Sequence, residues 1–345
     1  MNLRFTPITS VNNPKSVHGI YPYRGKISGV EAQQFISQLP QNITLLDPFC
    51  GSGTIVYEAA KHGLKSFGVD MNPLAVTLAQ GKLNIPQSKD EALSEGFENI
   101  NLAKSLTAFS NLNLAASKHF HEDTAIEIAR MATLYENLSP YLKACFLGAI
   151  CLTARGCNHY KWTSSTVGKD INPKNYINFY EKFSDKISKH YYPVKTSNNK
   201  VFHADARNLL SVIEPESIDL VYTSPPYFDC LDYTAYYAKI IYEIFEVNRE
   251  EIRSSLIQNY ASYKDSMTSV LAELHKVCKK NAQIVFVVGD KKIHGKVING
   301  ADFFNEITPF KVVDVIERGY TNSSSKVFDQ INKTERKEQI IIWKK

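Results

Sequence analysis

Residues 43–70 read ITLLDPFCGSGTIVYEAAKHGLKSFGVD, and this stretch decides the fold. A short apolar run ends in Asp47 and a glycine-rich loop follows it. A helix-like segment closed by Gly63 comes next, and a second β-prone run ends in Asp70. Strands that alternate with helices at this spacing predict a parallel sheet with helices on both of its faces.

The same alternation resumes near residue 200. Helices are expected from about Thr234 and from Ser266 to Lys279, and the last two β-prone runs are expected to pair as an antiparallel hairpin at the sheet edge. The predicted strands are residues 201–205, 217–222, 282–290, 310–317 and 339–343. The chain therefore belongs to the α/β fold class.

Residues 87–199 interrupt this pattern. Their apolar residues have helical spacing and do not alternate with β-prone runs, so they predict a mainly helical insertion in a catalytic domain formed by 1–86 and 200–345. Residues 141–200 hold ten Lys or Arg against three acids (10 − 3 = +7) and ten aromatic residues. Such a segment suits a polyanion with stackable bases, and it equally suits a solvated helical surface with an aromatic core.

The composition excludes several classes of protein. The 345 residues are 43% hydrophobic and 22% charged, which excludes wholesale disorder. No apolar run approaches the roughly 18 residues of a membrane span, and the N-terminus lacks the apolar core of a signal peptide. The six Cys include no Cys-x-x-Cys pair and the nine His are scattered. We therefore expect reduced thiols in a cytoplasmic protein with no membrane partner and no metal.

The glycine-rich loop matches neither common phosphate-binding pattern. No Gly-Lys-Ser/Thr follows it, and Val56 stands where the dinucleotide fingerprint requires a third Gly. The carboxylate of Asp70 suits the two hydroxyls of a ribose, and the positive helix end beyond Thr54 suits a carboxylate. S-adenosylmethionine has a ribose at one end and an amino-acid carboxylate at the other, and we expect it as the cofactor.

Two motifs resemble those of amino-group DNA methyltransferases. Residues 47–54, DPFCGSGT, are similar to the cofactor motif of that family, and residues 223–227, TSPPY, resemble its catalytic motif in the SPPY form typical of cytosine-N4 enzymes. Residues 18–26, 68–73 and 203–206 resemble further segments around the cofactor. The resemblance implies a Rossmann-like methyltransferase fold with a mostly parallel seven-stranded sheet. The cofactor-binding residues that it implies are Tyr23, Arg24, Asp47, Phe49, Gly51, Ser52, Gly53, Thr54, Asp70, Met71, Asp205 and Ala206.

The resemblance also implies the chemistry. An exocyclic amino group is a poor nucleophile, because its lone pair is delocalised into the ring. In the family, two acceptors hold its N–H bonds and favour a more pyramidal nitrogen; here they are the Ser224 hydroxyl and the Pro225 carbonyl. Successive prolines have a fixed φ and no N–H, so the turn presents its carbonyls rigidly. The implied catalytic residues are Ser224, Pro225, Pro226 and Tyr227, the last of which stacks on the base.

The function implied is methyl transfer to the N4 amino group of cytosine in double-stranded DNA. The expected setting is restriction–modification or phage defence in a prokaryotic cytoplasm, at the nucleoid, with a cognate restriction endonuclease as partner. Three alternatives stay open: adenine-N6 methylation, methylation of an amino group in RNA, and a DNA-binding regulator without turnover. The insertion is the candidate target-recognition region. Its candidate DNA contacts are Arg155, His159, Lys161, Trp162 and Lys169.

Overall fold

A computed structural model defines the architecture of the chain. It describes residues 3–5, 16–23, 27–154, 175–195, 198–226, 232–235, 237–293, 296–320 and 336–345. The strands of the main sheet are β1 (Thr44–Asp47), β2 (Lys65–Asp70), β3 (Asn199–His203), β4 (Ile218–Thr223), β5 (Cys278–Gly289), β8 (Lys311–Tyr320) and β9 (Arg336–Lys344). Strands β6 (Lys291–Ile293) and β7 (Lys296–Ile298) form a separate small ribbon.

The helices fall into three groups along the chain. Around the first strands lie α1 (Gly29–Ile36), α2 (Thr54–Lys61) and α3 (Pro73–Leu83). Between β2 and β3 follow α4 (Lys89–Ser105), α5 (Leu114–Ser117), α6 (Glu122–Thr133), α7 (Pro140–Thr153) and α8 (Phe179–Lys189). The second half has the 3₁₀ helix η4 (Ala206–Ser211), α9 (Tyr237–Ile244), α10 (Arg249–Ser255), α11 (Tyr260–Val277) and α12 (Gly300–Ile307).

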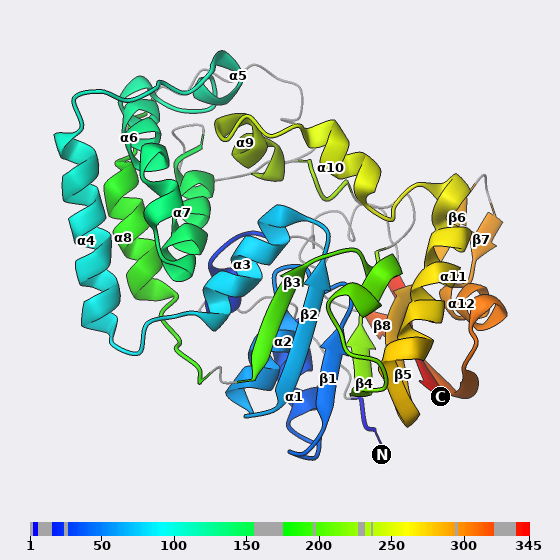
Figure 1. Cartoon of the computed structure of the whole chain (residues 1–345). Helices are drawn as coiled ribbons and strands as arrows, with labels where there is room; N and C mark the ends of the chain where they lie inside the picture. The colour runs from blue at the N-terminus through cyan, green and yellow to red at the C-terminus, as the bar shows by residue number, and fades with distance from the viewer. Residues whose placement is uncertain are drawn as a thin grey trace.

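The seven strands form one sheet in the order β3-β2-β1-β4-β5-β9-β8. The first five are parallel, and β9 runs antiparallel to both of its neighbours. The predicted α/β fold with a mostly parallel seven-stranded sheet is thereby confirmed (Figure 1). The last two strands pair antiparallel as expected, and β9 lies inside the sheet while β8 forms the edge.

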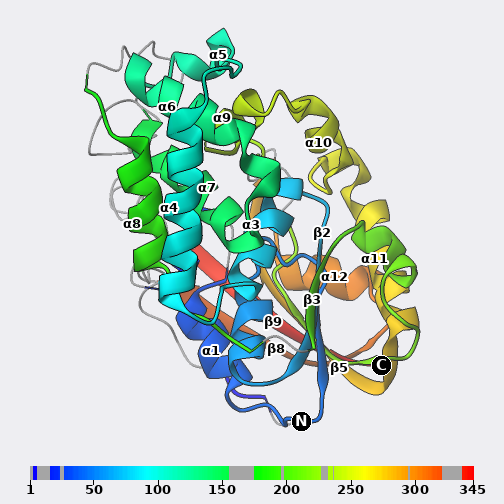
Figure 2. The same cartoon turned by 60° about the vertical axis from the view of Figure 1, so that its left-hand side comes forward.

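Alternate residues of the central strands face opposite layers, as the period of two in a strand requires. Leu45 and Tyr222 pack with α1 and α2 on one face. Leu46 and Val221 pack with α11 and α12 on the other face. Figure 2 shows the sheet between these two layers. Burial on both faces explains why the central strands are almost wholly apolar.

The helices of the insertion form a bundle beside the sheet, and α7 packs against α3 (Figure 1). The described aromatic residues of this region lie mostly inside the bundle: Tyr141, Phe146, Phe179 and Phe183 are fully buried. These rings form a helical core, so they are not available to stack on bases. The five candidate DNA contacts between Arg155 and Lys169 lie outside the described residues.

The helices after β4 differ from the expectation of one long helix from about Thr234. The structure has two short helices, and α11 begins at Tyr260, earlier than Ser266. Asn248 accepts from the backbone N–H groups of Glu250 and Glu251, and Asn259 caps α11 in the same way. Each Asn starts a new helix because its side chain satisfies free backbone donors. No helix among the described residues has the length and apolarity needed to cross a bilayer.

Candidate active site

The ends of two neighbouring strands carry the two motifs and are joined by a side-chain hydrogen bond. β1 ends at Asp47 and β4 ends at Thr223, and the Thr223 hydroxyl donates to Asp47 Oδ1 at 2.6 Å. The same oxygen accepts from the backbone N–H of Phe49 at 3.2 Å. Burial raises the pKa of Asp47 to about 7, although both hydrogen bonds lower it. The carboxyl of Asp47 therefore holds the cofactor motif against the catalytic motif.

The glycine-rich loop makes a tight turn into α2. Gly53 has φ +74°, and a Cβ there would lie 2.6 Å from Cβ of Ala79 on α3. Only glycine fits such a position without strain. Beneath the loop, Lys82 is 1% exposed and its Nζ donates to Ser52 Oγ at 3.2 Å. A lysine below the positive end of α2 makes this loop a favourable place for an anionic group.

Asp70, at the end of β2, is held by the backbone around it. Its Oδ2 accepts from Gly51 N and its Oδ1 from Asn72 N, each at 2.8 Å. Burial raises its pKa to about 6, while these backbone donors lower it. The group is therefore a carboxylate at neutral pH. The backbone N–H of Met71 is a third donor to this carboxylate, so a ligand diol would share its two oxygens with these backbone groups.

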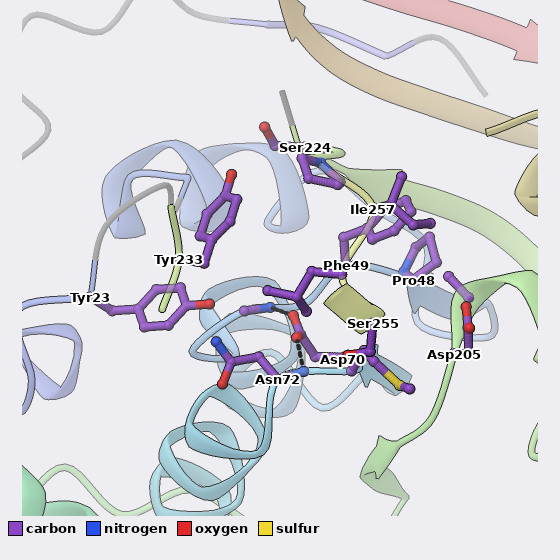
Figure 3. A pocket seen from close by; sticks show the side chains of 15 residues that line it. Tyr23, Pro48, Phe49, Asp70, Asn72, Asp205, Ser224, Tyr233, Ser255 and Ile257 are labelled. Atoms are coloured by element: carbon purple, nitrogen blue, oxygen red, sulfur yellow. Dashed lines mark hydrogen bonds between the residues drawn. The ribbon is translucent and has the colours of Figure 1, made fainter. Parts of the chain in front are cut away.

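A pocket of about 630 Å³, counting its open mouth, lies at this edge of the sheet. Figure 3 shows Tyr23 and Asp205 at opposite ends of it, with Phe49 and Asp70 between them and Ser224 above. The lining residues are Tyr23, Pro48, Phe49, Gly51, Asp70, Met71, Asn72, Asp205, Ala206, Ser224, Pro226, Tyr233, Ser255, Leu256 and Ile257.

The two ends of the pocket are held by different contacts. Tyr23 lies over the glycine-rich loop, and a Cβ on Gly51 would be 3.0 Å from its ring. At the other end, Arg207 Nε donates to both oxygens of Asp205, at 3.0 and 2.9 Å, and Arg207 Nη2 donates to Oδ2 at 2.6 Å. Arg207 Nη2 also reaches the carbonyl of Ser255 at 3.2 Å. Arg207 thus ties the Asp205 turn to the end of α10.

Most of the predicted site residues that are described come together here. Tyr23, Phe49, Gly51, Asp70, Met71, Asp205, Ala206, Ser224 and Pro226 line the pocket. Asp47, Ser52, Thr54 and Pro225 are buried beside it rather than in its lining, and Gly53 shapes the loop. Arg24 and Tyr227 lie outside the described residues.

Several residues of the site were missed by the sequence analysis. Asn72 Oδ1 accepts from Leu74 N at 3.0 Å and from the Tyr242 hydroxyl at 2.7 Å, so α9 is joined to the pocket wall. Asn72 falls in the segment 68–73 that resembles a cofactor segment, but the sequence indicated no role for it beyond starting a helix. Tyr233 carried no signal except that it follows the catalytic motif by six residues. The three residues at 255–257 carried none, because only the tertiary fold brings the end of α10 to this edge.

The residues present fit S-adenosylmethionine. Asp70 would hold the ribose hydroxyls and Asp205 the adenine amino group, with Phe49 and Ile257 as apolar walls for the flat ring. The positive end of α2, above Lys82, suits the carboxylate of the methionine end. When bound, the cofactor supplies an electrophilic methyl group. Among the described residues, no group of three or more His, Cys, Asp or Glu has an arrangement that could hold a metal ion.

Residues 31–292 match the family of D12 class N6 adenine-specific DNA methyltransferases, and the chain belongs to that family. The prediction of S-adenosylmethionine as the cofactor is confirmed. The chain is 24% identical over 271 residues to the Type II methyltransferase M.MvaI of Kocuria varians, a match that covers 68% of this chain and 58% of that protein. It is 25% identical over 268 residues to M.BsoBI of Geobacillus stearothermophilus, covering 66% and 52%. The chain thus spans little more than half the length of these relatives.

Among solved structures, a SAM-dependent methyltransferase from Methanosarcina mazei is 11% identical, with a TM-score of 0.36 and coverage of 90% of this chain and 95% of that one.

The family match corrects one prediction. The assignment to the cytosine-N4 type, and with it cytosine N4 as the methylated group, was wrong, because the family is adenine-specific. The error has a physical reason: a hydroxyl and a carbonyl accept hydrogen bonds from the exocyclic amino group of either base, so Ser224 does not discriminate between them.

Proposed function

We propose that this protein transfers a methyl group from S-adenosylmethionine to the N6 amino group of adenine in double-stranded DNA. The observation that carries the proposal is the shared pocket, in which Ser224 and Pro226 line the same cavity as Asp70 and Phe49. The hydrogen bond between Thr223 and Asp47 keeps the two motifs together. The description of the family supports adenine as the base.

In this reaction the chain activates and orients an amino group. The Ser224 hydroxyl accepts one N–H of the amino group and the Pro225 carbonyl accepts the other, which frees the nitrogen lone pair. The nitrogen then forms a bond to the methyl carbon, the sulfonium C–S bond breaks, and the amino group loses one proton to solvent. Most of the rate enhancement comes from holding the two reacting atoms in near-attack geometry. Tyr233 lies near Ser224 in Figure 3 and supplies an aromatic wall beside the base.

The insertion, residues 87–199, is proposed as the target-recognition region. Its support is the net charge of +7 between residues 141 and 200, from ten basic and three acidic residues. Positive charge on one segment favours contact with phosphates, which position DNA without reading its sequence. Not all of these basic side chains can contact phosphates, because Lys186 is buried and donates to the carbonyl of Gly19.

Restriction–modification is the proposed setting, with a cognate endonuclease as partner. The support is that M.MvaI and M.BsoBI are both called Type II methyltransferases. The catalytic proposal does not depend on this setting.

The test is a transfer assay with radiolabelled S-adenosylmethionine and polymerase-amplified DNA, which carries no methylated bases. Nucleosides from the product are then separated. We expect label in N6-methyladenine with the unaltered protein and none with Ser224→Ala. Ser254→Ala, at an exposed residue of α10, is the matched control and should keep full activity. Label in cytosine, or no label in the DNA, would overturn the proposal.

A further inference from the structure

Tyr263, the fourth residue of α11, contacts the catalytic turn (residues 224–226) from outside the pocket. Its hydroxyl donates to the carbonyl oxygen of Pro226 at 2.6 Å, across 37 residues of sequence. Pro226 itself lines the pocket, whereas Tyr263 does not. Tyr263 therefore reaches the reaction through Pro226, not through a contact with either substrate.

The donor is held on a rigid part of the molecule. Tyr263 is 2% exposed, and its ring lies 5.6 Å from the ring of Phe303 and 6.4 Å from that of Phe304, both on α12. It belongs to the buried cluster that packs α11 and α12 against the sheet. The Tyr263 hydroxyl is therefore held in place, and its hydrogen bond restricts movement of the catalytic turn.

The covalent structure of the turn explains why this hydrogen bond matters. In Pro225 and Pro226 the ring fixes φ, so ψ is the one soft backbone dihedral left in each residue. Neither proline has an N–H, so neither can be held by a bond in which its own nitrogen donates. A hydrogen bond to the Pro226 carbonyl fixes the peptide plane that follows the second proline. The hydroxyl of Tyr263 thereby restricts a turn whose two prolines have no N–H with which to form hydrogen bonds of their own.

We propose that Tyr263 is a positioning residue for methyl transfer: its hydroxyl sets the orientation of the catalytic turn, and so of the acceptors at Ser224 and Pro225. The inference rests on the proposed function of the same pocket. It assigns a role in the reaction to a residue of α11, far in sequence from both motifs. Loss of the hydroxyl should slow the methyl-transfer step while cofactor binding is retained, since Tyr263 lies outside the lining of the pocket that contains Asp70.

The test compares Tyr263→Phe with the unaltered protein and with Tyr260→Phe. The control removes a hydroxyl from the same helix one turn earlier, at a residue that is 50% exposed. Transfer to DNA is measured in steady-state and single-turnover reactions as total label, whichever base receives it, and binding of S-adenosylhomocysteine is measured by calorimetry. We expect Tyr263→Phe to lower kcat about 10- to 100-fold, the range for a small misplacement of reacting groups. We expect KM and the cofactor Kd to change less than about twofold.

The possible outcomes separate the inference from the function on which it rests. Equal kcat for Tyr263→Phe and the unaltered protein would overturn the inference and leave the function standing. A loss in cofactor binding equal to the loss in rate would also overturn it, because that result indicates general damage to the fold. No transfer by the unaltered protein to any base of DNA would overturn the proposed function, and the inference with it.

Discussion

Thr223 Oγ1 donates to Asp47 Oδ1 at 2.6 Å, and this bond joins the last residue of β4 to the last residue of β1. The two strands are parallel neighbours, so both chains leave the same edge of the sheet. The chain after Asp47 forms the cofactor loop, and the chain after Thr223 forms the catalytic turn. Asp47 is 3% exposed, so water has little access to this contact. The protonation state of the Asp47 carboxyl therefore affects the stability of the folded protein.

The first prediction concerns Asp47 and pH. Burial raises its pKa to about 7, well above the value of an unfolded Asp, so the folded state binds this proton more tightly. The stability that this proton contributes is present below about pH 4 and is lost as pH rises through 7. Asp47→Asn keeps an acceptor for Thr223 and removes the titration. Urea unfolding should show the variant gaining stability relative to the unaltered protein between pH 4 and 8.

Asp90→Asn, at an exposed carboxyl in the first turn of α4, is the control for this measurement and should show no such trend. A stability difference between Asp47→Asn and the unaltered protein that stays constant over the whole pH range would contradict a raised pKa.

The second prediction is that cofactor affinity depends on the ionisation of Asp70. A ribose diol donates to the carboxylate form, and the pKa of Asp70 is raised to about 6 by burial. Affinity for S-adenosylhomocysteine should be constant above about pH 7 and fall towards tenfold per pH unit well below 6. Calorimetric titrations from pH 5 to 8 measure this dependence. Asp70→Asn should bind more weakly at every pH and lack the pH dependence; equal affinity of the unaltered protein at pH 5 and 8 would refute the role of the carboxylate.

The third prediction concerns the fork of hydrogen bonds from Arg207 to Asp205. Arg207→Lys keeps the positive charge and loses the planar geometry that contacts both oxygens. We expect the Kd for the cofactor to rise by up to about tenfold, because Asp205 is then less well oriented. The free energy of unfolding should change by less than about 1 kcal/mol, since both side chains are partly exposed. Arg253→Lys on α10, with a half-exposed side chain, is the control. An unchanged Kd would show that the pair is only structural.

The fourth prediction addresses the insertion. If Lys161 and Lys169 contact phosphates, replacing both with Gln should reduce the slope of log K against log salt by about 2 in DNA binding. Lys311→Gln, at the start of the edge strand β8, should leave the slope unchanged. Fluorescence anisotropy with a labelled duplex between about 50 and 200 mM salt measures both slopes. An unaltered slope for the double variant would remove these two residues from the interface.

The sequence alone predicted the fold well, because the relevant signals are local. Apolar runs that end in an acid indicated β1 and β2, and Gly63 indicated the end of α2. The same signals located Asp47, Asp70 and Asp205, which lie at or just beyond strand ends where a parallel sheet places its ligands. The helices after β4 were predicted less well, because the helix-capping role of Asn248 and Asn259 was overlooked.

The rest of the site could not be predicted because it depends on contacts between distant segments. No sequence signal marked Lys82, which is buried beneath the loop at Ser52. Tyr263 contacts Pro226, and Arg207 contacts Ser255 as well as its near neighbour Asp205; only the folded chain brings Pro226 and Ser255 close to these side chains. The base could not be read from Ser224 for a chemical reason, since its hydroxyl accepts a hydrogen bond from any exocyclic amino group.

The most direct test of the account is to express the protein in a bacterial host and sequence the host DNA with modification-sensitive reads. Parallel cultures express Ser224→Ala and Asp70→Ala, which alter the two sides of the one pocket. The account predicts N6-methyladenine in a recurring sequence context with the unaltered protein, and none with either variant. N4-methylcytosine in place of N6-methyladenine, or methylation that persists with Ser224→Ala, would contradict it.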